Sequence, residues 1–269
     1  MDKRAEERTI ALVTGASSGI GAALASRFAA GGHDLVLVAR SADKLQAQAK
    51  RLAAEHGMRC WVAPADLTQR GAARTLAAAM KRARRPIDVL VNCAGVLEHG
   101  RFVDMPFERH MEQIDLNVAA LTEMLVCFVP PMVARGRGRV LNVASVAAFQ
   151  PVPTLATYAA TKAYVLSLTE SLSEELKGTG VTVTALCPGV TDTHMLSAAQ
   201  ESSESLRKLP ELMISSADAV AHEGYEACMS ADVIRVPGAI NLATAVAGRA
   251  MPKWLLRRMS GAVTRASVV

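Results

Sequence analysis

Tyr158 and Lys162 stand four residues apart in a segment whose apolar pattern predicts a helix at 156–177. At that spacing the two side chains lie on one helix face, one turn apart. A free phenol has a pKa of about 10 and is a poor acid–base group at neutral pH. A nearby ammonium favours the phenolate and lowers that pKa. The pair could therefore act as a general acid/base unit, although a purely structural pairing has the same spacing.

Ser145 and Asn117 could complete this unit. Ser145 follows an apolar strand predicted at 139–144, and ligands of doubly wound sheets bind outside the carboxyl ends of the strands. Its hydroxyl could polarise a substrate carbonyl and stabilise the developing oxyanion. Asn117 interrupts an apolar helix predicted at 107–134, and Asn is a weak helix former. It could hold a water that supplies protons to Lys162 through a kinked backbone, or it could simply face solvent.

The segment at 14–21 reads Thr-Gly-Ala-Ser-Ser-Gly-Ile-Gly and lies between a predicted strand and a predicted helix. Glycines allow the backbone to turn tightly and to approach a pyrophosphate without a Cβ clash. The N-terminus of the following helix offers N–H groups and a positive dipole to phosphates. The pattern indicates a dinucleotide site, and an ordinary tight turn is the alternative.

The end of the second predicted strand, at 34–39, bears on which dinucleotide would bind. NAD-selective sites place an acid there, whereas this sequence has Arg40 and Ser41. The Arg40 guanidinium could pair with a 2′-phosphate and Ser41 could add a hydroxyl, which favours NADP(H). Asp66, after the third strand, could accept a hydrogen bond from an adenine amino group or could cap the helix that follows.

These motifs occur in the order of a known family, and the chain resembles the short-chain dehydrogenase/reductases over residues 8–193. Within that family it resembles an NADP(H)-preferring, bacterial-type subgroup, and the stretch at 35–45 is also similar to 3-oxoacyl and 3-ketosphinganine reductases. One departure is Cys93, where the family usually has a second Asn. The likeness rests on the segment at 14–21, Asn92-Cys93-Ala94-Gly95, Asn117, Ser145, Tyr158-Ala-Ala-Thr-Lys162 and Pro188-Gly189.

The resemblance implies a role for each matching residue. Tyr158 would be the acid in reduction and the base in oxidation, Lys162 would hold the nicotinamide ribose, and Ser145 would orient the carbonyl. Asn117 would anchor a proton-relay water. The remaining cofactor contacts would be Gly15, Ser17, Ser18, Gly19, Ile20 and Gly21 at the diphosphate, Asp66 and Leu67 at the adenine, Asn92, Ala94 and Gly95 in the middle, and Pro188, Gly189, Val190 and Thr193 at the nicotinamide.

The elements that must position these residues alternate along the chain. Apolar strands alternating with helices predict a single α/β domain with a doubly wound parallel sheet, a Rossmann fold covered on both faces. The segment at 191–213 is expected to be mobile and loop-like, and 190–215 to form a substrate lid. The predicted strands are 9–14, 34–39, 59–63, 87–91, 139–144 and 181–186, and the predicted helices are 19–30, 41–56, 69–84, 107–134 and 156–177.

Composition narrows the classes of protein. The net charge is +5, but no acid follows Asp232, so the basic character belongs to a helical tail at 238–269 and does not indicate a nucleic-acid-binding body. Five scattered cysteines show no zinc or other metal pattern and no disulfide framework, which favours reduced thiols in the cytoplasm. We expect no signal peptide and no membrane span.

We expect an enzyme that moves a hydride between NADP(H) and a hydrophobic ketone, secondary alcohol or 3-oxoacyl substrate. Apolar residues around Ser145 and after Gly189 would contact that substrate, or they could merely pack together. The alternatives are an NAD(P)-linked alcohol dehydrogenase working in oxidation and a non-catalytic dinucleotide-sensing protein. The expected substrate residues are Val146, Phe149, Leu155, His194 and Met195, joined by Gln150, Pro151, Val152, Leu196, Leu209 and Met213.

Two surfaces are expected to meet partners. The basic tail contains Trp254 and could lie on an anionic membrane, but packing on its own domain or on another subunit is the favoured interpretation. In the family, the helices corresponding to 107–134 and 156–177 build a dimer through a four-helix contact. The resemblance therefore implies a homodimer or homotetramer.

Overall fold

One parallel sheet organises the chain in a computed structural model that describes residues 8–202, 207, 214–252, 254–258 and 261. The sheet order is β3-β2-β1-β4-β5-β6-β9, so the chain winds outward from β1 and then restarts at β4 on the other side. This is the expected doubly wound fold. The strands are β1 Ile10–Thr14, β2 Asp34–Ala39, β3 Cys60–Pro64, β4 Val89–Asn92, β5 Gly138–Val143, β6 Val181–Leu186 and β9 Ile234–Arg235.

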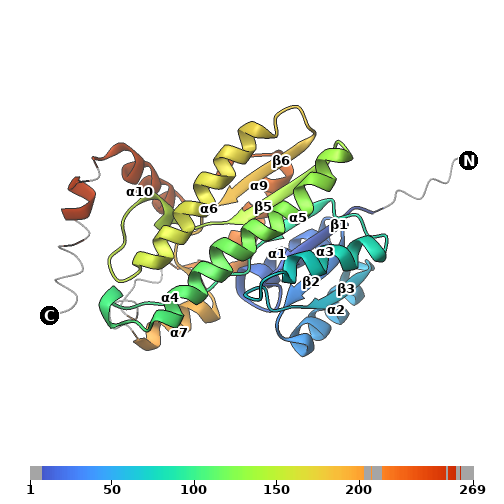
Figure 1. Ribbon diagram of the computed structural model, residues 1–269, viewed down its shortest axis with the longest axis horizontal. Coiled ribbons are helices and arrows are strands. Elements are labelled where there is room, and N and C mark those ends of the chain that lie inside the picture. The colour runs from blue at the N-terminus through green and yellow to red at the C-terminus, as the bar shows by residue number, and fades with distance from the viewer. Residues whose placement is uncertain (1–7, 203–206, 208–213, 253, 259–260, 262–269) are drawn as a thin grey trace, which may run out of the picture.

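Helices cover both faces of the sheet (Figure 1). One face is covered by α3 (Ala72–Arg82), α5 (Leu121–Ala134) and α6 (Ala156–Glu175). The other is covered by α1 (Gly19–Ala30), α2 (Ala42–His56) and α9 (Ala217–Ser230). Side chains alternate across each strand, so in β1 Leu12 joins the first core cluster and Val13 the second. Strands buried on both sides must be apolar throughout, which is the pattern that predicted the fold.

The helical run at 107–134 is continuous and changes character in its middle. It consists of α4 (Phe107–Ile114), a π-helical stretch at Asp115–Ala120, and α5. Pro130 and Pro131 lie inside α5 near its C-terminal end and do not end it, although each lacks the N–H that would bond a carbonyl of the preceding turn. The helix departs from α geometry at the π-helical stretch, well before the two prolines.

That run is also long and apolar enough to cross a membrane by length and composition alone, with 28 residues and a mean hydropathy of 1.7 in its most apolar window. However, 44% of that window is buried, and Met124, Phe128 and Met132 pack against the sheet. We interpret it as the core helix of the domain.

Residues 191–202 differ from the loop expected at 191–213, and residues 203–206 and 208–213 lie outside the described part of the chain. Thr191–Asp192 forms the short strand β7, which pairs with β8 (Ser215–Ser216), and His194–Ser202 forms helix α7. Thr193 starts this helix by accepting hydrogen bonds on its carbonyl oxygen from the N–H groups of Leu196 and Ser197. Polar Ser and Glu residues suggested a loop, but they are compatible with an exposed helix.

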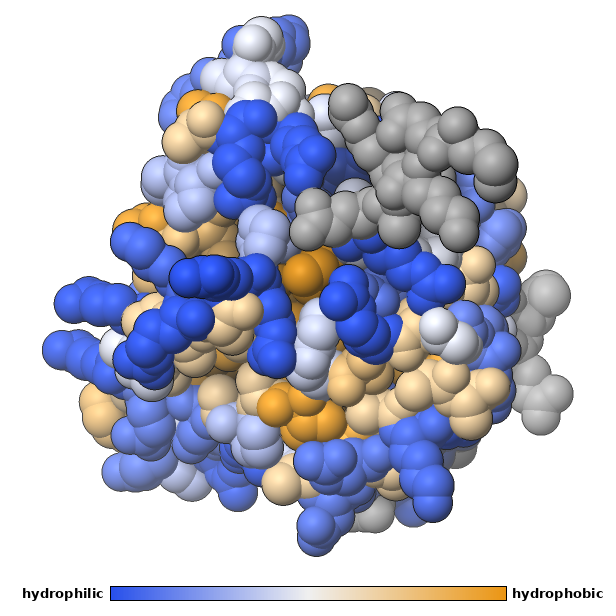
Figure 2. Space-filling view, turned by 90° about the vertical axis from the view of Figure 1, so that its right-hand side faces the viewer, coloured by the Kyte–Doolittle hydropathy of each residue, from blue (hydrophilic) through white to orange (hydrophobic). Residues whose placement is uncertain are grey.

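One edge of the sheet is strand β3, and the other is β9. Trp61 on β3 lies under two guanidinium groups, with the Cζ atoms of Arg59 and Arg85 5.4 and 4.1 Å from its ring centroid. Charged groups over an edge strand oppose pairing with another chain. The side of the molecule that carries α2, β3 and α3 is correspondingly hydrophilic, with only small hydrophobic patches (Figure 2).

A series of buried side-chain hydrogen bonds joins β4, β5 and α6. The Asn92 amide donates to Asn142 Oδ1 at 2.9 Å, and the Asn142 amide donates to Thr169 Oγ1 at 3.0 Å. Thr169 in turn donates to the Val165 carbonyl at 2.7 Å. Because α6 carries Tyr158 and Lys162, these bonds hold the helix with the candidate acid/base unit in register with the sheet.

Thr169→Val is expected to lower the free energy of unfolding by about 1–3 kcal/mol, because it leaves the buried Asn142 amide without its acceptor. Urea denaturation followed by circular dichroism measures this. Thr184→Val is the matched control, since that hydroxyl is also buried but has no hydrogen-bond partner among the described residues. Loss of the Thr184 hydroxyl should leave the free energy of unfolding unchanged or raise it. Equal effects of the two substitutions would contradict the role of the Asn92–Asn142–Thr169 bonds.

Candidate active site

The site begins where β1 and β4 end side by side. Thr14 Oγ1 accepts hydrogen bonds from the backbone N–H groups of Cys93 and Ala94, both at 3.0 Å, and donates to the Val91 carbonyl at 3.3 Å. The hydroxyl therefore ties the glycine-rich turn to the loop after β4. Thr14 belonged to the sequence motif but was not among the expected site residues. Its position at the end of an apolar strand, directly before Gly15, was the available signal.

The glycine-rich turn is as tight as its sequence suggested. Gly15 has a φ of +68°, and a Cβ there would lie 3.0 Å from the Cys93 carbonyl oxygen. A Cβ on Gly21 would clash with the Gly15 carbonyl, so helix α1 packs directly on the turn. Thr193, expected at the other end of the cofactor, lies against this turn, with its methyl carbon 3.0 Å from a Cβ built on Gly19.

The start of α1 fits a bound pyrophosphate. Ser18 is the N-cap but makes no side-chain cap hydrogen bond in the described part of the chain, and the first turn has no acidic residue. The N-terminal N–H groups and the helix dipole are therefore available to an anion. The expected diphosphate contacts Gly15, Ser17, Ser18, Gly19, Ile20 and Gly21 all lie in this turn or in the first turn of α1.

At the end of β2, Arg40 is exposed and Ser41 is the N-cap residue of α2 without a side-chain cap bond. Asp66 is already engaged, since its Oδ1 accepts from the Thr68 N–H at 3.1 Å and from the Thr68 hydroxyl at 2.7 Å. These bonds, with Arg40 as a weaker contributor, lower the pKa of the Asp66 carboxyl. Asp66 therefore stabilises its own turn and caps no helix, because α3 begins at Ala72 with Gly71 as its N-cap residue. Leu67 is buried in the core.

Ser145, Tyr158 and Lys162 come together at the carboxyl edge of the sheet. Ser145 Oγ accepts from the Ala147 N–H at 3.1 Å and lies near enough to the Tyr158 phenol to lower its pKa. Lys162 Nζ donates to the Val143 carbonyl at 2.9 Å and lies 5.7 Å from the centroid of the Tyr158 ring. Strand β5 thus supplies a partner to Lys162 and is followed, after Ala144, by Ser145, while α6 carries the other two groups.

Asn117 lies in the π-helical stretch and is 1% exposed, so the solvent-facing alternative is wrong. Its side chain accepts from the Val96 N–H and donates to the Val96 carbonyl, both at 2.9 Å. A Cβ on Gly95 would lie 3.1 Å from Asn117 Oδ1 and 3.5 Å from Lys162 Nζ. Asn117, Gly95 and Lys162 are therefore neighbours.

Two expected cofactor residues near this point differ in where their side chains lie. Asn92 is buried and its side chain is turned into the interior, where it donates to Asn142. Cys93 stands where the family usually has Asn. Burial raises the pKa of its thiol to about 12, so the thiol is neutral beside Lys162.

Burial governs the electrostatics of the acid/base pair. It raises the pKa of Tyr158 to about 12, and the hydrogen bond from Ser145 only partly opposes this. It lowers the pKa of Lys162 from 10.5 to about 8. The sequence predicted that Lys162 would lower the pKa of Tyr158. In the chain without cofactor the loss of solvation of the phenolate dominates, and the lowering that we expect from Lys162 together with a positively charged nicotinamide stays a prediction.

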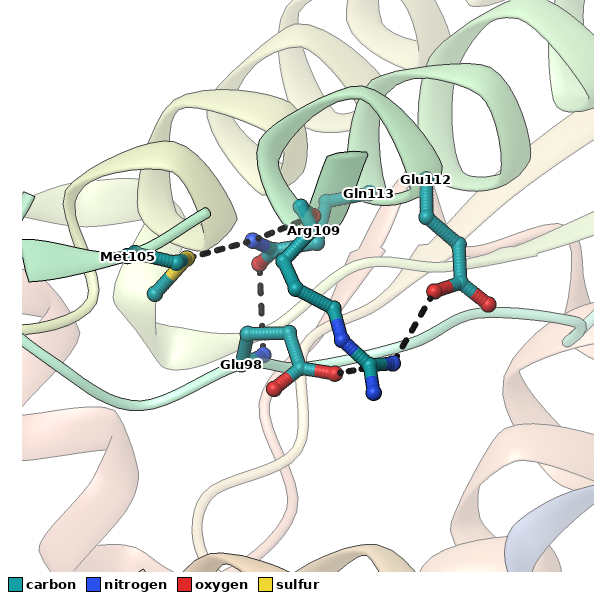
Figure 3. Close-up of polar contacts among 5 residues, drawn as sticks. All are labelled: Glu98, Met105, Arg109, Glu112 and Gln113. Carbon is teal, nitrogen blue, oxygen red and sulfur yellow. Dashed lines mark hydrogen bonds and ion pairs between the residues drawn. The ribbon is translucent and has the colours of Figure 1, made fainter. Parts of the chain in front are cut away.

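The loop after β4 is held by buried Gln113 of α4 (Figure 3). Gln113 Oε1 accepts from the Glu98 N–H at 3.4 Å, and its amide group donates to the Arg109 carbonyl at 3.3 Å. Arg109 Nη1 lies 3.3 Å from both Glu98 Oε1 and Glu112 Oε2. These contacts hold the loop that carries Ala94 and Gly95.

The expected substrate residues lie on two sides of the site. Val146 and Phe149 bound the 3-10 turn after Ser145, and Leu155 immediately precedes α6. His194 and Met195 are exposed at the start of α7. Pro188 contributes its carbonyl oxygen, which accepts from the Val146 N–H at 3.0 Å and from Ser145 Oγ at 3.5 Å. Leu209 and Met213 lie outside the described residues.

The tail contributes a helix that sequence reasoning did not place at the site. Helix α10 (Ala239–Ala250) packs on the wall that carries Phe149, with the Arg249 Cζ 5.1 Å from the Phe149 ring centroid. Arg249 also pairs with Glu170 of α6 at 2.6 Å. A Cβ on Gly189 would clash with the Asn241 amide of α10. Helix α10 therefore packs on its own domain, which is the interpretation that the sequence favoured for the tail.

Comparisons with known proteins agree with this geometry. A family profile described as short chain dehydrogenase matches residues 9–204. An uncharacterized oxidoreductase of Staphylococcus haemolyticus is 36% identical over 186 residues, which are 69% of this chain and 79% of that protein.

Solved structures extend the likeness to the whole fold. A short-chain dehydrogenase from Sphingobium yanoikuyae in complex with NADPH has a TM-score of 0.80 at 35% identity and covers 89% of this chain and 92% of its own. A bulky-bulky ketone specific alcohol dehydrogenase from Comamonas testosteroni has a TM-score of 0.76 at 30% identity, with 90% and 92% covered. A Burkholderia phymatum short chain dehydrogenase/reductase in complex with NAD has a TM-score of 0.79 at 26% identity, with 89% and 92% covered.

Lys162→Met is expected to stabilise the folded chain at pH 7 by about 2 kcal/mol, because the cost of the buried ammonium exceeds that of leaving the Val143 carbonyl unpaired. Below pH 8 the ammonium is present in both folded and unfolded chains, so the full difference in stability between the variant and wild type is expected there. Between about pH 8 and 10.5 the folded wild type loses its proton first and gains stability, so the difference narrows.

Urea denaturation of the cofactor-free protein at pH 7 and pH 10 measures both effects. Lys50→Met, at an exposed lysine of α2, is the control and should leave stability nearly unchanged. A Lys162→Met protein no more stable than wild type at pH 7 would contradict the burial argument.

Proposed function

The chain belongs to the short-chain dehydrogenase/reductase family and is an oxidoreductase, and from that premise we propose that it reduces a hydrophobic ketone or 3-oxoacyl-type substrate with NADPH. The observation that carries this is the junction of Ser145, Tyr158 and Lys162 beside the glycine-rich turn. An NAD(P)-linked alcohol dehydrogenase working in oxidation would use the same residues. A non-catalytic dinucleotide sensor would need none of them in place.

The chain's own groups supply proton transfer and orientation. The nicotinamide cofactor supplies the hydride when bound. Tyr158, with its pKa near 12, is a protonated phenol at neutral pH and can donate its proton to the carbonyl oxygen. Ser145 can donate a hydrogen bond to the same oxygen as negative charge develops on it. Tyr158 would be the acid in reduction, and its phenolate would be the base in oxidation, so the same residue serves both directions.

Lys162 and Asn117 would support proton transfer by Tyr158. Lys162 keeps cationic character at neutral pH with a pKa of about 8, which suits hydrogen bonding to the ribose of the cofactor and return of a proton toward Tyr158. Asn117, held on both sides of its amide by Val96, would fix the position of a relay water next to Gly95.

The preference for NADP(H) rests on Arg40. It is exposed at the end of β2, where the sequence has no acid to bind ribose hydroxyls. The NADPH complex of the Sphingobium relative supports this choice, although the Burkholderia relative holds NAD. A guanidinium beside the 2′-phosphate adds charge-assisted hydrogen bonds that NAD lacks.

The substrate class rests on apolar side chains around Ser145. Val146 and Leu155 flank the catalytic residues in the chain, and Met195 lies on the α7 side. The similarity to an alcohol dehydrogenase specific for bulky-bulky ketones supports a hydrophobic carbonyl. The partner is thus a small molecule, with no nucleic acid involved, and five free cysteines suit a reducing cytoplasm.

We also propose a homodimer or homotetramer built on α4, α5 and α6. Large apolar residues are exposed there, with Phe107 71% and Val126 67% exposed. A groove of about 360 Å³ opens between α4 and α6. Its lining is apolar apart from two threonines, and consists of Phe102, Ile114, Val118, Ala156, Thr157, Ala160 and Thr161.

Tyr158→Phe is expected to lower kcat about a hundredfold to ten-thousandfold, because the phenyl ring cannot donate the proton. NADPH consumption against small diketones, long 3-oxoacyl thioesters and steroid ketones measures it. Tyr164→Phe is the matched control on the same helix, since that phenol is 39% exposed and bonds only to Thr122 among the described residues. No turnover of any ketone by a wild type that binds NADPH tightly would favour the sensing role.

Arg40→Ala is expected to raise KM for NADPH about tenfold to a hundredfold and to leave KM for NADH nearly unchanged, since only NADPH carries the 2′-phosphate. Initial rates with both cofactors measure the ratio. Lys50→Ala, which removes another exposed charge of α2, should alter neither. A wild type that prefers NADH would end the NADP(H) proposal.

A further inference from the structure

Helix α10 has one face on the protein and another with no partner among the described residues. Ala245 is 4% exposed, and half-buried Asn241 and Gly248 lie on the same side, against Gly189 and Phe149. At 100° per residue, the opposite side is a continuous apolar stripe. We call it the α10 stripe, and it consists of the exposed residues Ala239, Ile240, Leu242, Ala243, Val246, Ala247 and Ala250.

The exposure of the α10 stripe is substantial. Ile240 is 51% exposed, Leu242 is 50% exposed and Val246 is 57% exposed. Isolated exposed apolar residues need no explanation, but a full helix face without a polar side chain indicates a surface that meets another apolar phase. Polar Thr244 and charged Arg249 lie at the two margins of the stripe.

The chain around the α10 stripe is exclusively basic. No Asp or Glu follows Asp232, whereas Arg249, Lys253, Arg257, Arg258 and Arg265 do. Arg258 is exposed on the helical turn that follows α10, and Trp254 on the same turn is 55% exposed. Exposed apolar side chains with Trp and flanking bases are the composition of helices that lie in the interface of an anionic bilayer.

A second copy of the chain fits the α10 stripe less well. Two stripes facing each other across a two-fold axis would bring both sets of tail bases together with no acid of the tail to balance them. The position of α10 suits docking on a flat surface, since this helix lies at the end of the molecule opposite α2 and β3 (Figure 1). The side seen in Figure 2 is mostly hydrophilic and would face water.

We propose that the α10 stripe, with Trp254 and the bases that follow it, docks the protein on an anionic phospholipid surface. The helix lies in the interface with its apolar side chains among the lipid chains and its arginines at the phosphates. The proposal does not depend on the reaction or on the cofactor, because the contact is made by side chains that point away from the domain.

Flotation with vesicles tests the docking on the full-length protein. Wild type should float with vesicles of equal parts phosphatidylglycerol and phosphatidylcholine, and much less with phosphatidylcholine alone or in high salt. Leu242→Ser with Val246→Ser should reduce recovery about tenfold, because both lost side chains enter the lipid. Val233→Ser removes an exposed valine outside α10 and is the matched control.

Two charge variants separate the electrostatic contribution to vesicle binding from the apolar contribution. Arg258→Gln should weaken binding to the anionic vesicles only, whereas Arg70→Gln, at an exposed base of the loop before α3, should not. Thermal unfolding confirms that each variant is folded. Failure of wild type to float, or undiminished flotation of the double serine variant, would overturn the proposal. So would a smaller oligomer of that variant by size-exclusion chromatography without lipid, because a second copy would then cover the stripe.

Discussion

The pairing of β1 with β4 is the constraint on which the rest of the site depends. The connection after β1 leaves toward the α1 face and the connection after β4 toward the α5 face, so the ends of both strands stay uncovered. Thr14 uses one hydroxyl to bind the two loops at that point. The glycine-rich turn and the loop with Ala94 and Gly95 are therefore held against each other, and every other site residue is placed relative to this junction.

The same burial that shapes the site also shifts its acid and base in opposite directions. A phenol and an ammonium removed from water both favour their neutral forms, so the pKa of Tyr158 rises and that of Lys162 falls. Backbone groups compensate part of this cost, with the Val143 carbonyl on Lys162 and both backbone groups of Val96 on Asn117. Orientation is thus in place before a substrate binds, at the expense of folding stability.

Helix α10 joins the variable end of the chain to this site. Its inner side touches Gly189 and the wall after Ser145, and Arg249 links that wall to α6 through Phe149 and Glu170. Its outer side is the apolar stripe. A short amphipathic element cannot be stable alone, so its packing on the domain is what allows the outer face to be presented in a defined direction.

The sequence by itself determined the fold class, the order of strands and helices as far as β6, and the meeting of Ser145 with Tyr158 and Lys162. These follow from local patterns: apolar strands of a doubly buried sheet, a helical spacing of four, and a residue at a strand's carboxyl end. Only the tertiary structure decided that Asp66 stabilises its own turn, that Asn117 is pinned to Val96, that α7 is helical and that α10 reaches the site. The tertiary structure also determined that burial raises the pKa of Tyr158. These outcomes depend on burial and on partners distant in sequence, and no local pattern encodes either.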